Sequence, residues 1–164
     1  MRTPDQYQPF SQVRAYRVIT FTLVFMAVGT ITELVLLEHY EDQWQLIPIL
    51  LVGAAIAFFI LLKWYSPKAL ILIFNGLMMG CAVSGFLGIW FHLKANMEFE
   101  MELHPSSSGW SLFLDSLAGA LPALAPGSMI VFDLIGYVYT ILILKQPKRI
   151  ELKNYGAYWR LSFL

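Results

Sequence analysis

The chain has 164 residues, of which 58% are hydrophobic and 13% are charged, and it carries no net charge. Its mean hydropathy is +0.63. A soluble globular domain has roughly 25% charged residues, so this composition excludes one and predicts an integral membrane protein. The single cysteine, Cys81, lies in an apolar stretch, which excludes an intrachain disulfide and any CxxC metal or redox motif.

Four apolar runs are long enough to cross a membrane as helices, because a span needs about 20 predominantly apolar residues. They cover residues 18–37, 46–62, 69–91 and 127–144. The first run is too long for the hydrophobic region of a signal peptide, so we interpret it as a retained span. The sequence therefore predicts an all-α fold: a bundle of four transmembrane helices forming one integral membrane domain over residues 1–164.

The basic residues predict the orientation, since Lys and Arg near span ends resist translocation. With four spans, ten of the eleven basic residues fall on one side, and Lys94 alone falls on the other. We therefore expect both termini in the cytoplasm, in a plasma or inner membrane. The ten are Arg2, Arg14, Arg17, Lys63, Lys68, Lys145, Lys148, Arg149, Lys153 and Arg160.

The connection over residues 92–126 is predicted to be a long outer loop. Its segment 96–104 alternates apolar and polar residues as a strand does. A lone strand at a membrane surface has no partner for its backbone, so we expect the third helix to continue until Pro105. Ser111 is expected to cap a short interfacial helix that runs to Ala120. The segment 120–126, apolar but broken by two prolines, is expected to dip into the outer interface or to pack on the bundle.

The basic and aromatic tail, residues 145–164, is expected to lie on the inner membrane surface. A disordered tail, or a strand that docks on a partner, is the alternative.

Small residues recur at steps of four in the third span. Such spacing lets another helix approach closely in a membrane. The neighbour is either another helix of this chain or a helix of a second copy. The predicted packing residues are Gly76, Gly80, Ser84 and Gly88.

Polar residues predicted near the outer ends of the spans form a candidate site. An ionisable group inside a span is costly unless it is paired or hydrated, so it is a functional candidate by default. The site would bind a proton or a divalent metal; the alternative is that these groups only reach the headgroups or hydrate a small vestibule. Its residues are Glu33, His92, Asn96 and Asp133, with Glu100 at the edge.

Three functions follow as hypotheses. The first is a non-catalytic membrane subunit or interaction protein, whose partners are the lipid bilayer and another membrane protein or a second copy. The second is cation or proton binding and translocation through the candidate site. The third is a redox subunit that carries haem, held by His39 and His92, or contacts quinone. No catalytic or nucleic-acid-binding motif occurs in the chain, which favours a protein that is not an enzyme and has no nucleic-acid partner.

Overall fold

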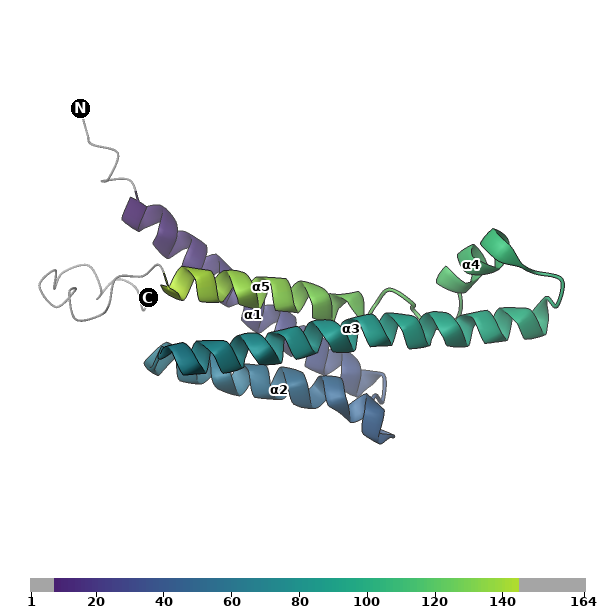
Figure 1. Ribbon diagram of the computed structural model, residues 1–164, viewed down its shortest axis with the longest axis horizontal. Helices are drawn as coiled ribbons and strands as arrows, with labels where there is room; N and C mark the ends of the chain where they lie inside the picture. The colour runs from purple at the N-terminus through teal and green to yellow at the C-terminus, as the bar shows by residue number, and fades with distance from the viewer. Residues whose placement is uncertain (1–7, 145–164) are drawn as a thin grey trace, which may run out of the picture.

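The computed structural model describes residues 8–144, which form five α-helices and no strand (Figure 1). Four helices are long and apolar enough to span a membrane, as the sequence predicted. These are α1 (Gln8–Leu36), α2 (Gln43–Trp64), α3 (Lys68–Leu103) and α5 (Gly127–Leu144), and the short fifth helix is α4 (Gly109–Leu117). The all-α architecture is therefore that of a multi-pass membrane protein. The predicted surface tail 145–164 lies outside the described residues.

Local sequence signals explain where the helices begin and end. The Asp42 side chain caps α2 by accepting hydrogen bonds from the backbone N–H groups of Trp44 and Gln45, at 2.7 and 3.0 Å. A helix is disfavoured at the residue before a proline, and α2 ends at Trp64, shortly before Pro67. The α3 helix begins directly after Pro67 and ends before Pro105. Residues 96–103, which alternate like a strand in sequence, are helical.

The four long helices pack in a ring in the order α1, α2, α3, α5, with α5 returning to contact α1. Figure 1 shows α1 crossing the other helices obliquely, while α3 and α5 run side by side. We call the end of the bundle with the α1–α2 turn and the α3–α5 connection the long-loop end. The other end, where α1 begins and α5 finishes, is the opposite end.

Aromatic side chains fill the bundle toward the opposite end. Tyr139 is fully buried, and its ring centroid lies 5.0 Å from that of Phe59, 5.7 Å from that of Tyr16 and 6.1 Å from that of Phe74. These four rings come from α1, α2, α3 and α5. Aromatic pairs at such distances stabilise a core beyond the area that they bury. Tyr139 therefore joins all four candidate spans.

At the long-loop end, α3 extends past the other helices and α4 packs against this extension (Figure 1). Thirty-six residues of α-helix rise about 54 Å, whereas the hydrocarbon core of a bilayer is about 30 Å thick. Part of α3 must therefore lie outside the hydrocarbon. The chain then returns through residues 118–126, and Pro126 packs on Gly85 and Gly88, well inside the apolar part of α3.

Candidate functional site

A cavity lies between α1 and α3 near the long-loop end. Its volume is about 80 Å³, and α1, α2, α3 and residues 122–129 all contribute to its wall. We call it the loop-end cavity. Its lining residues are Thr30, Glu33, Leu34, Leu37, His39, Pro48, Ser84, Gly88, His92, Pro122, Ala125, Pro126, Ser128 and Met129.

Three titratable side chains reach this cavity from three different segments. Glu33 comes from α1, His39 from the α1–α2 turn and His92 from α3. The two imidazole centroids lie 6.0 Å apart, with the rings inclined by 54°. Two of the predicted site residues, Glu33 and His92, thus line one cavity.

The backbone carbonyl of Pro122 fixes the tautomer of His92. The Nδ1 atom lies 3.2 Å from this oxygen, and a carbonyl oxygen can only accept, so Nδ1 carries the proton. The Nε2 atom of a neutral imidazole is then the acceptor. His92 can therefore take up a further proton only at Nε2.

Three residues that carry hydroxyl groups also contribute to the wall of the cavity, which is otherwise mainly apolar. They are Thr30, Ser84 and Ser128. A water molecule takes up about 30 Å³ of liquid volume and needs two to four polar partners. The loop-end cavity, at about 80 Å³, has the size and the chemistry for a few waters or a small cation.

Asn96, another predicted site residue, binds backbone groups rather than facing the cavity. Its Nδ2 atom donates to the carbonyl oxygens of Ser116 and Leu121, at 2.9 and 2.7 Å, and its Oδ1 atom accepts from the Leu121 N–H at 3.0 Å. The side chain is 2% exposed. Gly119 sits against it so closely that an added Cβ would lie 2.6 Å from the Asn96 Cγ atom. Asn96 therefore clamps the end of α4 and the returning chain onto α3.

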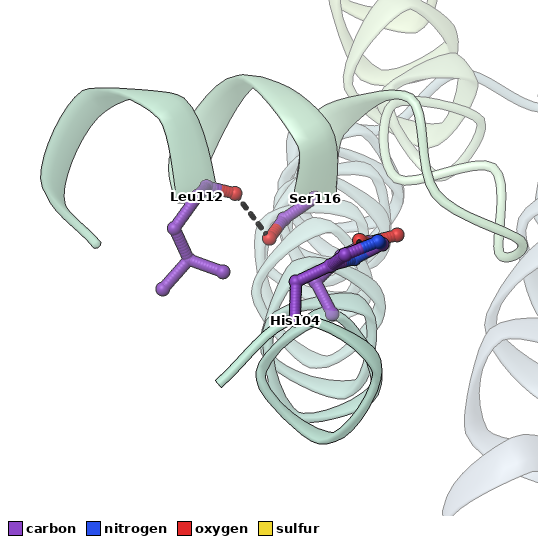
Figure 2. A network of polar contacts seen from close by, with 4 residues as sticks. His104, Leu112 and Ser116 are labelled. Carbon is purple, nitrogen blue, oxygen red and sulfur yellow. Dashed lines mark hydrogen bonds and ion pairs between the residues drawn. The ribbon is translucent and has the colours of Figure 1, made fainter. Parts of the chain in front are cut away.

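The clamp is supported from within α4. The buried Ser116 hydroxyl donates to the Leu112 carbonyl oxygen at 2.6 Å. Figure 2 shows this bond on α4. The Ser116 carbonyl lies in the last turn of α4, where carbonyl groups have no i+4 N–H partner within the helix, so it can accept from Asn96.

The two remaining predicted site residues lie away from the cavity. Glu100 pairs with His104, at 3.4 Å between Oε2 and Nδ1, near the end of α3. Asp133 is half-buried on α5, within electrostatic reach of Cys81. Residues 8–144 contain no group of three or more His, Cys, Asp or Glu side chains that could hold a metal ion. The arrangement of these residues thus gives no support to the predicted divalent metal.

The predicted packing residues have different neighbours. A Cβ added at Gly80 would lie 3.1 Å from Leu51 of α2, and one added at Gly88 would lie 2.7 Å from Pro126. Gly76 has open space around it, and Ser84 lines the cavity. Gly85 lies next to Ser84, and a Cβ added at Gly85 would lie 2.8 Å from the carbonyl oxygen of Pro126. At the long-loop end, small residues therefore make room for the returning chain and for the first turn of α5, where Met129 and Ile130 each lie 3.0 Å from a Cβ added at Gly85.

No protein-family model, curated protein or solved structure matches the chain. Its function is therefore argued from the arrangement of its own residues.

Sequence reasoning missed three contributors to the cavity. His39 was considered only as a haem ligand, and Pro122 and Pro126 only as helix breakers, yet all three line the wall. The sequence signal for this wall is the pair of prolines in an otherwise apolar segment. Prolines predict non-helical backbone, and at membrane depth such backbone occurs only where it is buried in protein or lines a cavity.

Proposed function

We propose that this protein is a non-catalytic membrane subunit that binds another membrane protein, or a second copy of itself, through its long-loop end. The binding element is the arm, defined as α3 from His92 to Leu103 together with α4. The observation that carries the proposal is the set of large apolar side chains that the arm exposes. They are Phe99, at 47% exposed, Leu103 at 56%, Trp110 at 72% and Leu114 at 47%.

Exposed apolar side chains on the candidate spans can contact lipid tails, whereas those of the arm lie beyond the apolar stretch of α3. The exposed residues follow the apolar stretch of α3 by about two to three helical turns, and α4 packs alongside this extension. Exposed apolar side chains gathered outside a core mark interaction sites. The buried Leu112 and Ser116 hold α4 on α3, so the exposed residues sit on a supported platform.

The distribution of basic residues supports an outward-facing arm in a plasma or inner membrane, with both termini cytoplasmic. The partner would then meet the arm at the outer membrane surface.

Photocrosslinking in cells tests this proposal. A photoreactive amino acid replaces Trp110 or Leu114 on the arm, and replaces Phe21, an α1 residue that is 70% exposed, as the matched control. We expect a discrete protein adduct at the arm positions and lipid adducts alone at position 21. An adduct at twice the chain mass identifies a second copy, and any other discrete mass a different protein. Lipid adducts alone at both arm positions would refute the proposal.

The loop-end cavity supports a second candidate function, the binding or translocation of a proton or small cation. The specific observation is that Glu33, His39 and His92 converge on one cavity from three segments. The cavity volume of about 80 Å³ is well below the roughly 300 Å³ at which small-molecule pockets begin. It favours a proton or a small ion over haem, the third hypothesis.

Flux measurements in proteoliposomes test this second candidate. We expect the wild type to carry protons or monovalent cations down an imposed gradient, and Glu33→Gln with His92→Ala to abolish the flux. Glu102→Gln removes a carboxylate from the exposed end of α3 and is the matched control. Flux that survives in the Glu33→Gln/His92→Ala variant would exclude the cavity as its route.

A further inference from the structure

A second hollow lies on the membrane-facing side of α1, next to the loop-end cavity. Its volume is about 560 Å³, within the range of roughly 300–1,000 Å³ usual for small-molecule sites. We call it the α1 groove. It is lined by Phe25, Val28, Gly29, Thr32, Glu33, Leu36, Leu37, Pro122 and Ala125.

The α1 groove and the loop-end cavity share part of their walls. Glu33 and Leu37 of α1, with Pro122 and Ala125 of the returning chain, line both hollows. Glu33 is the only ionisable residue of the groove. Both hollows are lined mainly by apolar surface, and the carboxyl group of Glu33 lies where they meet.

The groove also has a direction. Phe25 precedes Glu33 by eight residues, which places it about 12 Å further along α1 toward the opposite end. The groove thus extends from a charged group near the long-loop end into the apolar part of the bundle. An amphiphile of one membrane leaflet has this same polarity, with its head at the surface and its tail pointing to the midplane.

Charge complementarity selects the head group. Lys94 lies 3.5 Å from Glu98, and His104 lies 3.4 Å from Glu100. Glu33 takes part in no such pair with a residue of the described part of the chain. A carboxylate at a lipid-facing wall is unfavourable unless it is paired or hydrated. A primary ammonium would supply the opposite charge and three donors, and the hydroxyls of Thr30, Ser84 and Ser128 line the cavity directly behind Glu33.

From these observations we infer that the α1 groove binds an amphiphile with a primary ammonium head, which enters laterally from the membrane, places its tail along α1 and its head at Glu33. The site needs neither a partner on the arm nor a cation in the loop-end cavity, so it stands apart from both functions proposed above.

Gly29 provides a way to block the groove without disturbing the fold. A Cβ added at Gly29 meets nothing within 4 Å, and the same holds at Gly53 on α2, which does not line the groove. Gly29→Leu therefore fills the groove, and Gly53→Leu is the matched control for adding the same side chain to a span.

The experiment uses the full chain in lipid nanodiscs with two photoreactive probes, diazirine-labelled hexadecylamine and diazirine-labelled hexadecanol, at neutral pH. We expect the amine to label the groove residues of α1 about tenfold more than the alcohol, which corresponds to 1.4 kcal/mol. Glu33→Gln should reduce amine labelling to the level of the alcohol. Gly29→Leu should remove labelling of the groove by both probes, and Gly53→Leu and Glu102→Gln should change nothing.

Equal labelling by both probes in the wild type would overturn the inference, since the groove would then be ordinary lipid-facing surface. Amine labelling that persists in Glu33→Gln would overturn it as well, and so would crosslinks to a second copy in place of probe adducts. Each variant is first checked for the wild-type elution volume and helix content.

Discussion

The two ends of the bundle bury very different side chains. Toward the opposite end, the rings of Tyr16, Phe59, Phe74 and Tyr139 come together from all four candidate spans. At the long-loop end, a cavity lined by Glu33, His39 and His92 takes the place of such a cluster, and backbone hydrogen bonds to Asn96 hold the chain that returns from α4. The first end is held by packing, and the second by a few directed polar contacts around a hollow. Stability and binding can therefore be altered separately in this protein.

Truncation of the aromatic centre should have the largest effect. Tyr139→Ala removes a fully buried ring that contacts three others, and we expect a loss of about 3–5 kcal/mol in unfolding free energy. The measurement is reversible SDS-driven unfolding in mixed micelles.

Tyr139→Phe is the control for the ring itself. The Tyr139 hydroxyl is buried and makes no hydrogen bond of standard geometry with the described residues, although it interacts with the side chain of Tyr16. Its removal should therefore change the unfolding free energy by no more than about 1 kcal/mol, far less than Tyr139→Ala. A loss as large as that of Tyr139→Ala would show that the hydroxyl, and not the packed ring, holds this end together.

Loss of the Asn96 clamp should have an intermediate and local effect. Asn96→Ala removes three hydrogen bonds, two of them to the backbone of Leu121, while the Ser116 carbonyl keeps the Gly119 N–H at 3.4 Å; the loss should lower stability by about 2–3 kcal/mol. Hydrogen exchange should speed up in α4 and residues 118–126 and stay slow around Tyr139.

The matched control for the clamp is the same substitution at Asn75. The Oδ1 atom of Asn75 is buried without a hydrogen-bond partner in the described part of the chain, so Asn75→Ala should be close to neutral. Equal destabilisation by the two alanines would contradict the clamp.

Close helix packing should give the smallest of these effects. A Cβ at Gly136 would overlap the Met78 side chain, with 2.9 Å to its Cγ atom, so Gly136→Ala should lower the unfolding free energy by about 1–2 kcal/mol. At Gly53 the added methyl meets open space, and Gly53→Ala should be neutral or stabilising by up to about 1 kcal/mol. Thermal denaturation of the two variants side by side gives the comparison, and a destabilised Gly53→Ala would refute the packing argument.

The spans could be predicted from the sequence because bilayer thickness imposes their length. The apolar runs 46–62, 69–91 and 127–144 fall within α2, α3 and α5, respectively. The extension of α3 to Leu103 could be predicted because a lone strand over residues 96–104 would have had no partner for its backbone groups.

The site was harder to predict because its geometry depends on a chain that folds back. Glu33 and His92 share a cavity, as their predicted depth suggested. Asn96, by contrast, binds backbone carbonyls, and Glu100 pairs with a histidine one turn away. Backbone carbonyl and N–H groups occur in almost every residue, so the sequence does not show which polar side chain will bind them. It therefore does not distinguish an asparagine that holds the backbone, as Asn96 does, from one that binds a metal ion. Pro126 on Gly88 likewise depends on the path of residues 118–126.

The length of α3 has a consequence for the membrane around the protein. Its 36 residues form one unbroken helix that is longer than the hydrocarbon core of an average bilayer requires. In a thicker bilayer, hydrophobic mismatch at α3 is relieved because more of the same helix enters the hydrocarbon, and in a thinner one because α3 tilts or protrudes further. The arm would therefore change its height above the membrane with bilayer thickness, without any break in the helix that carries it.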